Sequence, residues 1–192
     1  MKFRINYVVF SAGIPFLAAA AFFLAGDMRT NYCYAVLFSG LHETGHILAL
    51  LCFGKKPKNI TFGIMGIRIE ATSMMLSYRD ECIVSLCGPF VNLFFAVIFA
   101  IADSDSLPFA INSGLFVINM LPVKTLDGGR FLYNLMLIHT NEENADRIMR
   151  IIEICTVILI ISVMTISLIK GYVNTSFVFF SVTLVMIILL QF

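Results

Sequence analysis

The stretch FSGLHETGHILALL, residues 38–51, sets two histidines and a glutamate in the middle of a run of apolar side chains. It lies within an apolar segment over residues 31–53, which is long enough to cross a lipid bilayer. Ionisable groups inside such a segment are costly, and where they occur they face a bundle interior or a water-filled cavity. These three polar side chains therefore need partners from elsewhere in the chain.

The composition is that of an integral membrane protein. Of the 192 residues, 59% are hydrophobic and only 13% are charged, and the mean hydropathy is +0.93. Soluble domains carry about a quarter charged residues. We therefore expect the lipid bilayer as a partner, and no nucleic acid, because no basic patch is interleaved with aromatic residues. The five cysteines form no C-x-x-C pair and are interpreted as small apolar residues in helices.

Six apolar segments predict an all-α polytopic membrane protein that forms a single domain over residues 1–192. The six predicted transmembrane helices cover residues 6–25, 31–53, 81–102, 107–121, 148–169 and 176–192. The first segment follows Lys2 and Arg4 and has features of a signal peptide. It is about 20 residues long and lacks an A-x-A exit, so we expect a retained transmembrane helix.

The positive charges predict the orientation of the chain in the membrane. Of the thirteen Lys and Arg residues, eleven flank the segments on one side, and only Arg29 and Lys170 lie on the other. That second side also carries the acidic loop ADSDS, residues 102–106. Because Lys and Arg in short loops stay in the cytoplasm, both termini are expected there.

Residues 58–78, KNITFGIMGIRIEATSMMLSY, interrupt the helical pattern. They alternate, are rich in β-branched residues and contain Gly63 and Gly66. This predicts a short β-hairpin or sheet element at the cytoplasmic membrane face. The alternative is an irregular amphipathic loop. An exposed strand edge at this place would be able to pair with an extended peptide.

His42, Glu43 and His46 form the pattern H-E-x-x-H. On a helix the two histidines lie one turn apart on the same face, so both can reach one zinc ion. Glu43 then lies beside a zinc-bound water, whose pKa falls to about 7. His46 is seven residues from Phe53, at the end of the segment, which places it roughly 10 Å into the membrane. A polar cavity open to the cytoplasm is implied.

A catalytic zinc ion usually takes three protein ligands. The stretch NMLPVKTLDGGR, residues 119–130, offers Asp127 just after the fourth segment, with Pro122 ending the helix before it. Taken alone, Asp127 is better explained as the N-cap of a helix at the membrane surface. The remaining histidine, His139, is expected at the cytoplasmic surface.

The third segment contains SLCGPFVNLFFA, residues 85–96. Gly88 and Pro89 permit close helix packing or a kink. Asn92 needs a hydrogen-bond partner in the membrane. From the residues alone, it joins two helices or it belongs to the active site.

Three stretches together resemble one family. HETGH, GPFVN and NMLPVKTLDGG are similar, in order, spacing and transmembrane placement, to the motifs of the site-2 protease family of intramembrane zinc metalloproteases. The layout is most similar to the compact six-span bacterial branch that includes the sporulation sigma-factor-processing protease. The resemblance implies one zinc ion per chain, bound by His42, His46 and Asp127. It further implies Glu43 as the catalytic base, and contacts of Asn92 and Asn119 with the substrate backbone or the oxyanion.

The resemblance also implies a function. It is hydrolysis of a peptide bond in or near a transmembrane segment of a single-span or membrane-tethered protein, as in regulated intramembrane proteolysis. The expected location is the bacterial plasma membrane, with the active site toward the cytoplasmic side. Relatives often carry a PDZ or a CBS domain, and neither is expected here. A catalytically inactive zinc-binding membrane protein, acting as a carrier or a partner chaperone, is the alternative, but it would have no need of Glu43 as a base.

Overall fold

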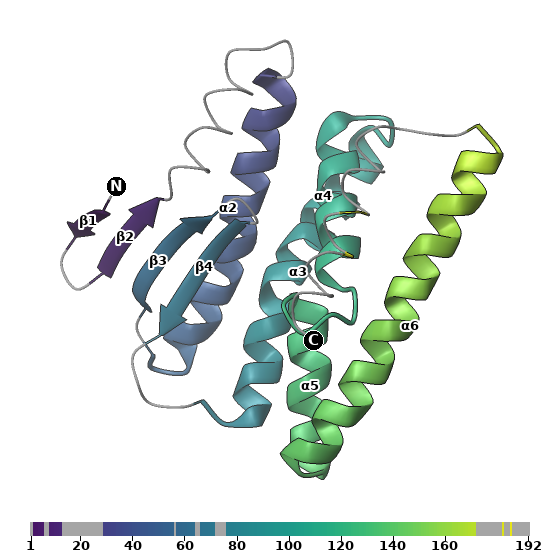
Figure 1. The fold of residues 1–192 in the computed structure, drawn as a ribbon. Helices are drawn as coiled ribbons and strands as arrows, with labels where there is room; N and C mark the ends of the chain where they lie inside the picture. The colour runs from purple at the N-terminus through teal and green to yellow at the C-terminus, as the bar shows by residue number, and fades with distance from the viewer. Residues whose placement is uncertain are drawn as a thin grey trace.

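The computed structural model describes residues 2–5, 8–12, 29–55, 57–63, 66–71, 76–171, 182 and 185. A small sheet lies on one side of a group of helices (Figure 1). In chain order, the elements are β1 (Lys2–Ile5), β2 (Val8–Ala12), α2 (Arg29–Cys52), β3 (Pro57–Gly63), β4 (Gly66–Ala71), α3 (Tyr78–Ala102), α4 (Leu107–Asn119), α5 (Asp127–His139) and α6 (Glu142–Ile169).

Three of the described helices are long and apolar enough to cross a membrane: α2, α3 and α6. They coincide with the predicted segments 31–53, 81–102 and 148–169. Helix α4 occupies the fourth predicted segment but has only 13 residues. At 1.5 Å per residue it is about 20 Å long, which is shorter than the roughly 30 Å hydrocarbon core. The predicted count of six transmembrane helices is therefore not supported.

The two outer predicted segments have different outcomes. Residues 8–12, inside the predicted helix 6–25, form strand β2, so this part of the prediction is wrong. The backbone hydrogen-bonding groups of this run, VVFSA, are satisfied by pairing with β1 and β3. The rest of that segment and nearly all of 176–192 lie outside the described residues.

The sheet has the strand order β1-β2-β3-β4. Strands β2 and β3 run parallel, whereas β1 pairs with β2 and β3 pairs with β4 in antiparallel fashion. Strands β3 and β4 fall mostly in the alternating segment 58–78, with Ile60 opposite Ile69 and Gly63 opposite Gly66. Strand β4 forms one edge of the described sheet and contacts α2.

Local sequence sets the helix ends around the centre of the molecule. Ser77 caps α3 by accepting a hydrogen bond from the Asp80 N–H at 3.2 Å. Helix α2 ends at Cys52, and Gly54, two residues further on, has a φ of +69°, a left-handed conformation suited to glycine. The Lys55 N–H then donates to the Leu50 carbonyl at 2.9 Å, which satisfies one of the last carbonyls of α2.

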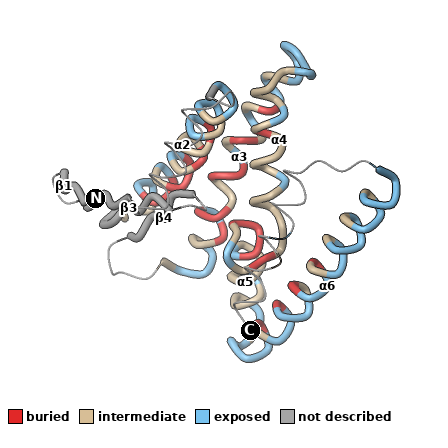
Figure 2. Tube along the Cα trace, turned by 45° about the horizontal axis from the view of Figure 1, so that its top comes forward, coloured by how far each residue is buried: buried red, intermediate tan, exposed pale blue. Residues whose placement is uncertain are grey.

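Helix α3 is the central element of the group. Helices α2, α4 and α5 all pack against it, and α4 and α5 follow one another along its length (Figure 1). Gly45 of α2 lies so close to α3 that a Cβ there would be 2.6 Å from the Cys87 carbonyl oxygen. The buried residues of α2, α3 and α5 gather between these helices, whereas α6 is largely exposed (Figure 2). Its exposed side chains include Ile158 and Leu159, as expected for a surface in contact with lipid.

Candidate metal centre

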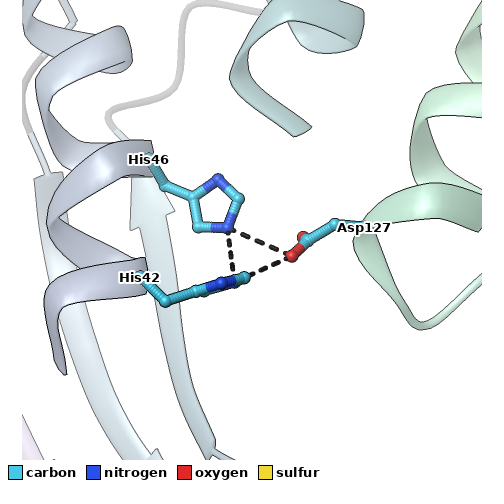
Figure 3. A group of neighbouring side chains, drawn as sticks. All are labelled: His42, His46 and Asp127. Atoms are coloured by element: carbon cyan, nitrogen blue, oxygen red, sulfur yellow. Dashed lines mark hydrogen bonds and ion pairs between the residues drawn. The ribbon is translucent and has the colours of Figure 1, made fainter. Parts of the chain in front are cut away.

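Two histidines of α2 and the first residue of α5 converge on one point (Figure 3). Asp127 Oδ2 lies 2.9 Å from His42 Nε2 and 3.2 Å from His46 Nε2, and the two Nε2 atoms are 3.1 Å apart. All three side chains are buried. The one-turn spacing of His42 and His46 brings both rings to the same face of α2, as the sequence predicts.

The other nitrogen of each imidazole is held by a neighbour on α3. His42 Nδ1 lies 2.6 Å from Asn92 Oδ1, and His46 Nδ1 lies 2.8 Å from the Val84 carbonyl oxygen. Both oxygens are acceptors, so each Nδ1–H donates. In a neutral imidazole the Nε2 atom then carries the lone pair. The tautomer of both rings thus presents Nε2 toward Asp127.

The arrangement fits a zinc ion. Three lone-pair acceptors, two imidazole nitrogens and one carboxylate oxygen, face one another within 3.2 Å, and a cation between them removes their repulsion. Two histidines and a carboxylate are a donor set of catalytic zinc sites. A Cβ at Gly88 would overlap His46 Nε2 and lie 2.7 Å from His42 Nε2, so only glycine leaves room here. Among the described residues, this is the single group of His, Cys, Asp and Glu whose ligand atoms converge.

A chain of side-chain amides supports His42 from behind. Asn92 is fully buried, and its Nδ2 donates to Asn112 Oδ1 at 3.1 Å. Asn112 Nδ2 in turn donates to the Pro108 carbonyl oxygen of its own helix at 2.8 Å. The side-chain amide of Asn92 is thus hydrogen-bonded to both His42 and Asn112, and its expected contact with the substrate or the oxyanion stays a prediction. Asn112 is not among the residues predicted from the sequence, although an amide in the apolar run of α4 carries the same signal as Asn92.

Asp127 is the first residue of α5, and Leu126 occupies the N-cap position. The alternative of a surface N-cap therefore does not hold. A carboxylate in the first turn of a helix is favoured by the helix dipole. The helix start packs directly on the loop 120–126, because a Cβ at Gly129 would overlap the Val123 carbonyl and lie 2.7 Å from Lys124 N.

Glu43 and Asn119 are the remaining predicted site residues. Glu43 is partly buried on α2, and its carboxyl group interacts electrostatically with His42, His46 and Asp127. Asn119 ends α4, where its Nδ2 donates to the Leu115 carbonyl oxygen at 2.9 Å. Among the described residues, Asn119 makes no hydrogen bond to His42, His46 or Asp127. His139 is exposed at the end of α5, as expected.

A cleft of about 380 Å³ opens where α3 begins and α5 follows the loop. Arg130, one turn after Asp127, lies 3.6 Å from Glu81 of α3 across this cleft.

Lys124 also lines the cleft. Partial burial lowers the pKa of Lys124, but the hydrogen bond to Asp146 outweighs this effect, so the pKa lies above its ordinary value. The cleft is lined by Leu76, Tyr78, Glu81, Lys124, Arg130, Tyr133 and Asn134.

The fold is similar to that of the site-2 protease from Methanocaldococcus jannaschii. The TM-score is 0.64 at 17% sequence identity, and the match covers 97% of this chain and 92% of that chain. No protein-family model and no curated protein matches the sequence. At this identity the likeness establishes the fold, and the chemistry has to be argued from the residues of this chain.

Proposed function

We propose that this chain is an intramembrane zinc metalloprotease of the site-2 protease family. It would hydrolyse a peptide bond in or near a transmembrane segment of a membrane-tethered protein. The convergence of His42, His46 and Asp127, with Glu43 beside them on an apolar helix, carries the proposal. The likeness in fold to a site-2 protease supports it.

Each site residue has a role in this reaction. His42, His46 and Asp127 would hold one zinc ion per chain, which supplies a water of lowered pKa and polarises a carbonyl group. Glu43 takes a proton from the attacking water and passes it to the leaving nitrogen. Glu43 is partly buried and interacts electrostatically with His42, His46 and Asp127, which suits a group that exchanges protons within the site. Asn119, near the loop that leads to Asp127, is proposed to contact the substrate backbone or the oxyanion.

The substrate segment must be extended, because the amides of a helix are hydrogen-bonded within it. Strand β4 is an edge strand and contacts the helix that carries both histidines. We propose that the substrate adds to this edge as a further strand, so that main-chain hydrogen bonds hold it. The cleft beside Arg130 offers room for the part of the substrate that follows.

The proposed setting is the bacterial plasma membrane, with both termini in the cytoplasm. The bias of Lys and Arg toward one side of the apolar segments supports this orientation. Cleavage would then take place toward the cytoplasmic side and release a cytosolic fragment, as in regulated intramembrane proteolysis. The substrate is a single-span or membrane-tethered protein.

Metal analysis of detergent-purified protein tests the ligand set. We expect about one zinc ion per chain in the wild type, in Glu43→Gln and in the control His139→Ala, which lies on the surface. His46→Ala and Asp127→Ala should lose it, because each removes one of three donors. Zinc retained in Asp127→Ala would disprove this ligand set.

Cleavage of a single-span reporter tests the activity. The reporter carries a Gly-Pro pair near the cytoplasmic end of its helix, so that the segment is already unwound there. Wild-type protein should produce a new fragment by mass spectrometry, and Glu43→Gln should not, although it still binds zinc. Equal cleavage by Glu43→Gln would refute the role of Glu43, whereas zinc without any cleavage would favour a carrier or chaperone.

A further inference from the structure

We propose that Glu153 of α6 is a positioning residue for the metal centre. It anchors the loop 120–126, and the start of α5, with Asp127, rests on this loop. The inference rests on the proposed zinc function of His42, His46 and Asp127.

Glu153 makes an unusual contact for a carboxyl group in an apolar helix. It is only 5% exposed, and its Oε1 accepts a hydrogen bond from the Lys124 backbone N–H at 2.8 Å. Burying a carboxyl group is costly unless it is hydrogen-bonded. The partner is a main-chain atom. Helix α6 therefore fixes the backbone of the loop and not merely one of its side chains.

The same face of α6 holds the loop through apolar contacts. Val123 is completely buried, and Val157 and Ile160 of α6 pack against it. Their spacing from Glu153, at four and seven residues, places all three on one side of the helix. One helix face therefore fixes two successive residues of the loop, Val123 by packing and Lys124 by a hydrogen bond.

The position of the loop backbone determines the position of Asp127 directly, because no side chain lies between the loop and the first turn of α5 at Gly128 and Gly129. Lys124 N lies 2.7 Å from where a Cβ of Gly129 would be, and Met120 Cα lies 2.8 Å from the corresponding point at Gly128. The backbone of the loop and the first turn of α5 are thus in direct contact. A displacement of Lys124 has to displace the turn that begins with Asp127.

The metal centre gives a readout that does not require a substrate. Cobalt(II) in place of zinc has visible absorption bands that respond to ligand geometry, and the rate of zinc loss to a chelator reports how well the three donors are held. Glu153→Gln keeps an acceptor oxygen for Lys124 N–H and should match the wild type in both measurements. Glu153→Leu removes the acceptor, and we expect altered cobalt bands and zinc loss faster by about ten-fold, as for other groups that orient metal ligands.

Thr156→Val is the matched control. Thr156 is buried on the same helix, but its hydroxyl donates only to the Ile152 carbonyl of α6, at 2.8 Å. It should leave the cobalt spectrum and the zinc loss unchanged. A change as large as that in Glu153→Leu would assign the effect to general packing of α6 and overturn the inference.

Two other results would also overturn it. One is wild-type zinc retention in Glu153→Leu, and the other is equal loss in Glu153→Gln, which would point to charge instead of the hydrogen bond. Should Glu153→Leu fail to fold, Glu153→Ser leaves room for a water at the Lys124 N–H, and slow zinc loss from it counts against the anchor. Absence of zinc from the wild type would instead refute the proposed function itself.

Discussion

At His42 both ring nitrogens have polar partners, and these partners fix the orientation of the ring. Nδ1 is hydrogen-bonded to Asn92, which leaves Nε2 facing Asp127 and His46. Asn92 is itself hydrogen-bonded to Asn112, so the orientation of His42, a proposed metal ligand, depends on three helices, α2, α3 and α4. Groups that orient metal ligands in this way contribute to metal affinity although they do not touch the metal.

Asn92→Leu should weaken zinc binding without removing a ligand. The substitution leaves His42 Nδ1–H without its acceptor, and we expect the zinc dissociation constant to rise about 10- to 100-fold. Asn112→Leu, one step further away, should have a smaller effect in the same direction. Competition with a chromogenic chelator measures both values.

Asn134→Ala is the control for these two variants. Its amide donates to the Arg130 carbonyl of its own helix and not to a metal ligand, so zinc affinity should stay at the wild-type value. An unchanged dissociation constant in Asn92→Leu would show that the hydrogen bond to His42 does not orient the ring.

At the scale of elements, the separation of α2 and α3 is set by glycine. Gly45 faces the Cys87 carbonyl and the Val91 side chain at distances that leave no space for a Cβ. Gly88 of α3 likewise leaves no space for a Cβ, because the imidazoles of His42 and His46 lie against it. Small residues let helices approach closely in a membrane, where packing drives association. The metal ligands of α2 and the amide of α3 meet only because of this approach.

Gly45→Ala should destabilise the protein, and Gly40→Ala on the same helix should not. A Cβ at position 45 would force α2 away from α3, with a cost of about 1–3 kcal/mol. At position 40 no atom lies within 4 Å of a Cβ, and alanine is the better helix former by up to about 1 kcal/mol. Thermal unfolding in detergent should therefore give midpoints shifted in opposite directions. Equal shifts would contradict the close packing at Gly45.

The local part of the site was predictable from sequence, and the long-range part was not. His42 and His46 share a helix, so their spacing alone predicts a shared face. Asp127 is brought to them by tertiary packing, and the residues alone favour a surface N-cap for it. Glu153 and Asn112 carry the signal of a polar group in an apolar helix, but their partners, Lys124 N–H and Asn92, depend on packing that no local pattern specifies.

The fold shows the same division. Helices α2, α3 and α6 follow from long apolar runs, whereas α5 carries charged and polar residues in DGGRFLYNLMLIH and was not predicted. Residues 8–12 are apolar enough for a membrane helix, yet they form β2. This strand pairs with β3, which lies far along the chain, and a local pattern does not reveal such a contact. Hydropathy therefore recognises the apolar helices and misses the elements whose conformation depends on pairing or packing with distant parts of the chain.

At the scale of the whole molecule, the proposed zinc ion joins α2 to α5. The ligands are 85 positions apart in sequence. A ligand that binds only the folded state stabilises it by mass action. The proposed zinc ion would thus contribute to the stability of the folded chain as well as to the proposed reaction.

Removal of zinc should lower the thermal midpoint of the wild type. At a free zinc concentration of 100 times the dissociation constant, the stabilisation is about 2.7 kcal/mol. A chelator should therefore shift the midpoint of the wild type and leave that of His46→Ala unchanged. A chelator effect of the same size on both proteins would show that the stabilising metal is bound elsewhere.

Cysteine labelling should reveal the orientation of the chain. In a cysteine-free background, Ser104→Cys places a thiol in the loop between α3 and α4, and Lys55→Cys places one after α2. An impermeant maleimide added to intact cells should label position 104 and not position 55, because Lys and Arg gather on the cytoplasmic side. The reverse pattern would invert the proposed topology, and lysed cells provide the control in which both positions react.

The separation of the ligands along the chain has a further consequence for synthesis. Chains grow at about 5–20 residues per second, so Asp127 is made roughly 4–17 s after His42. During this interval the nascent chain holds two histidines and Glu43 in the membrane without the carboxylate that completes the set. If the proposed function holds, the newly inserted chain would therefore be unable to cleave neighbouring membrane proteins until the segment with Asp127 has been made.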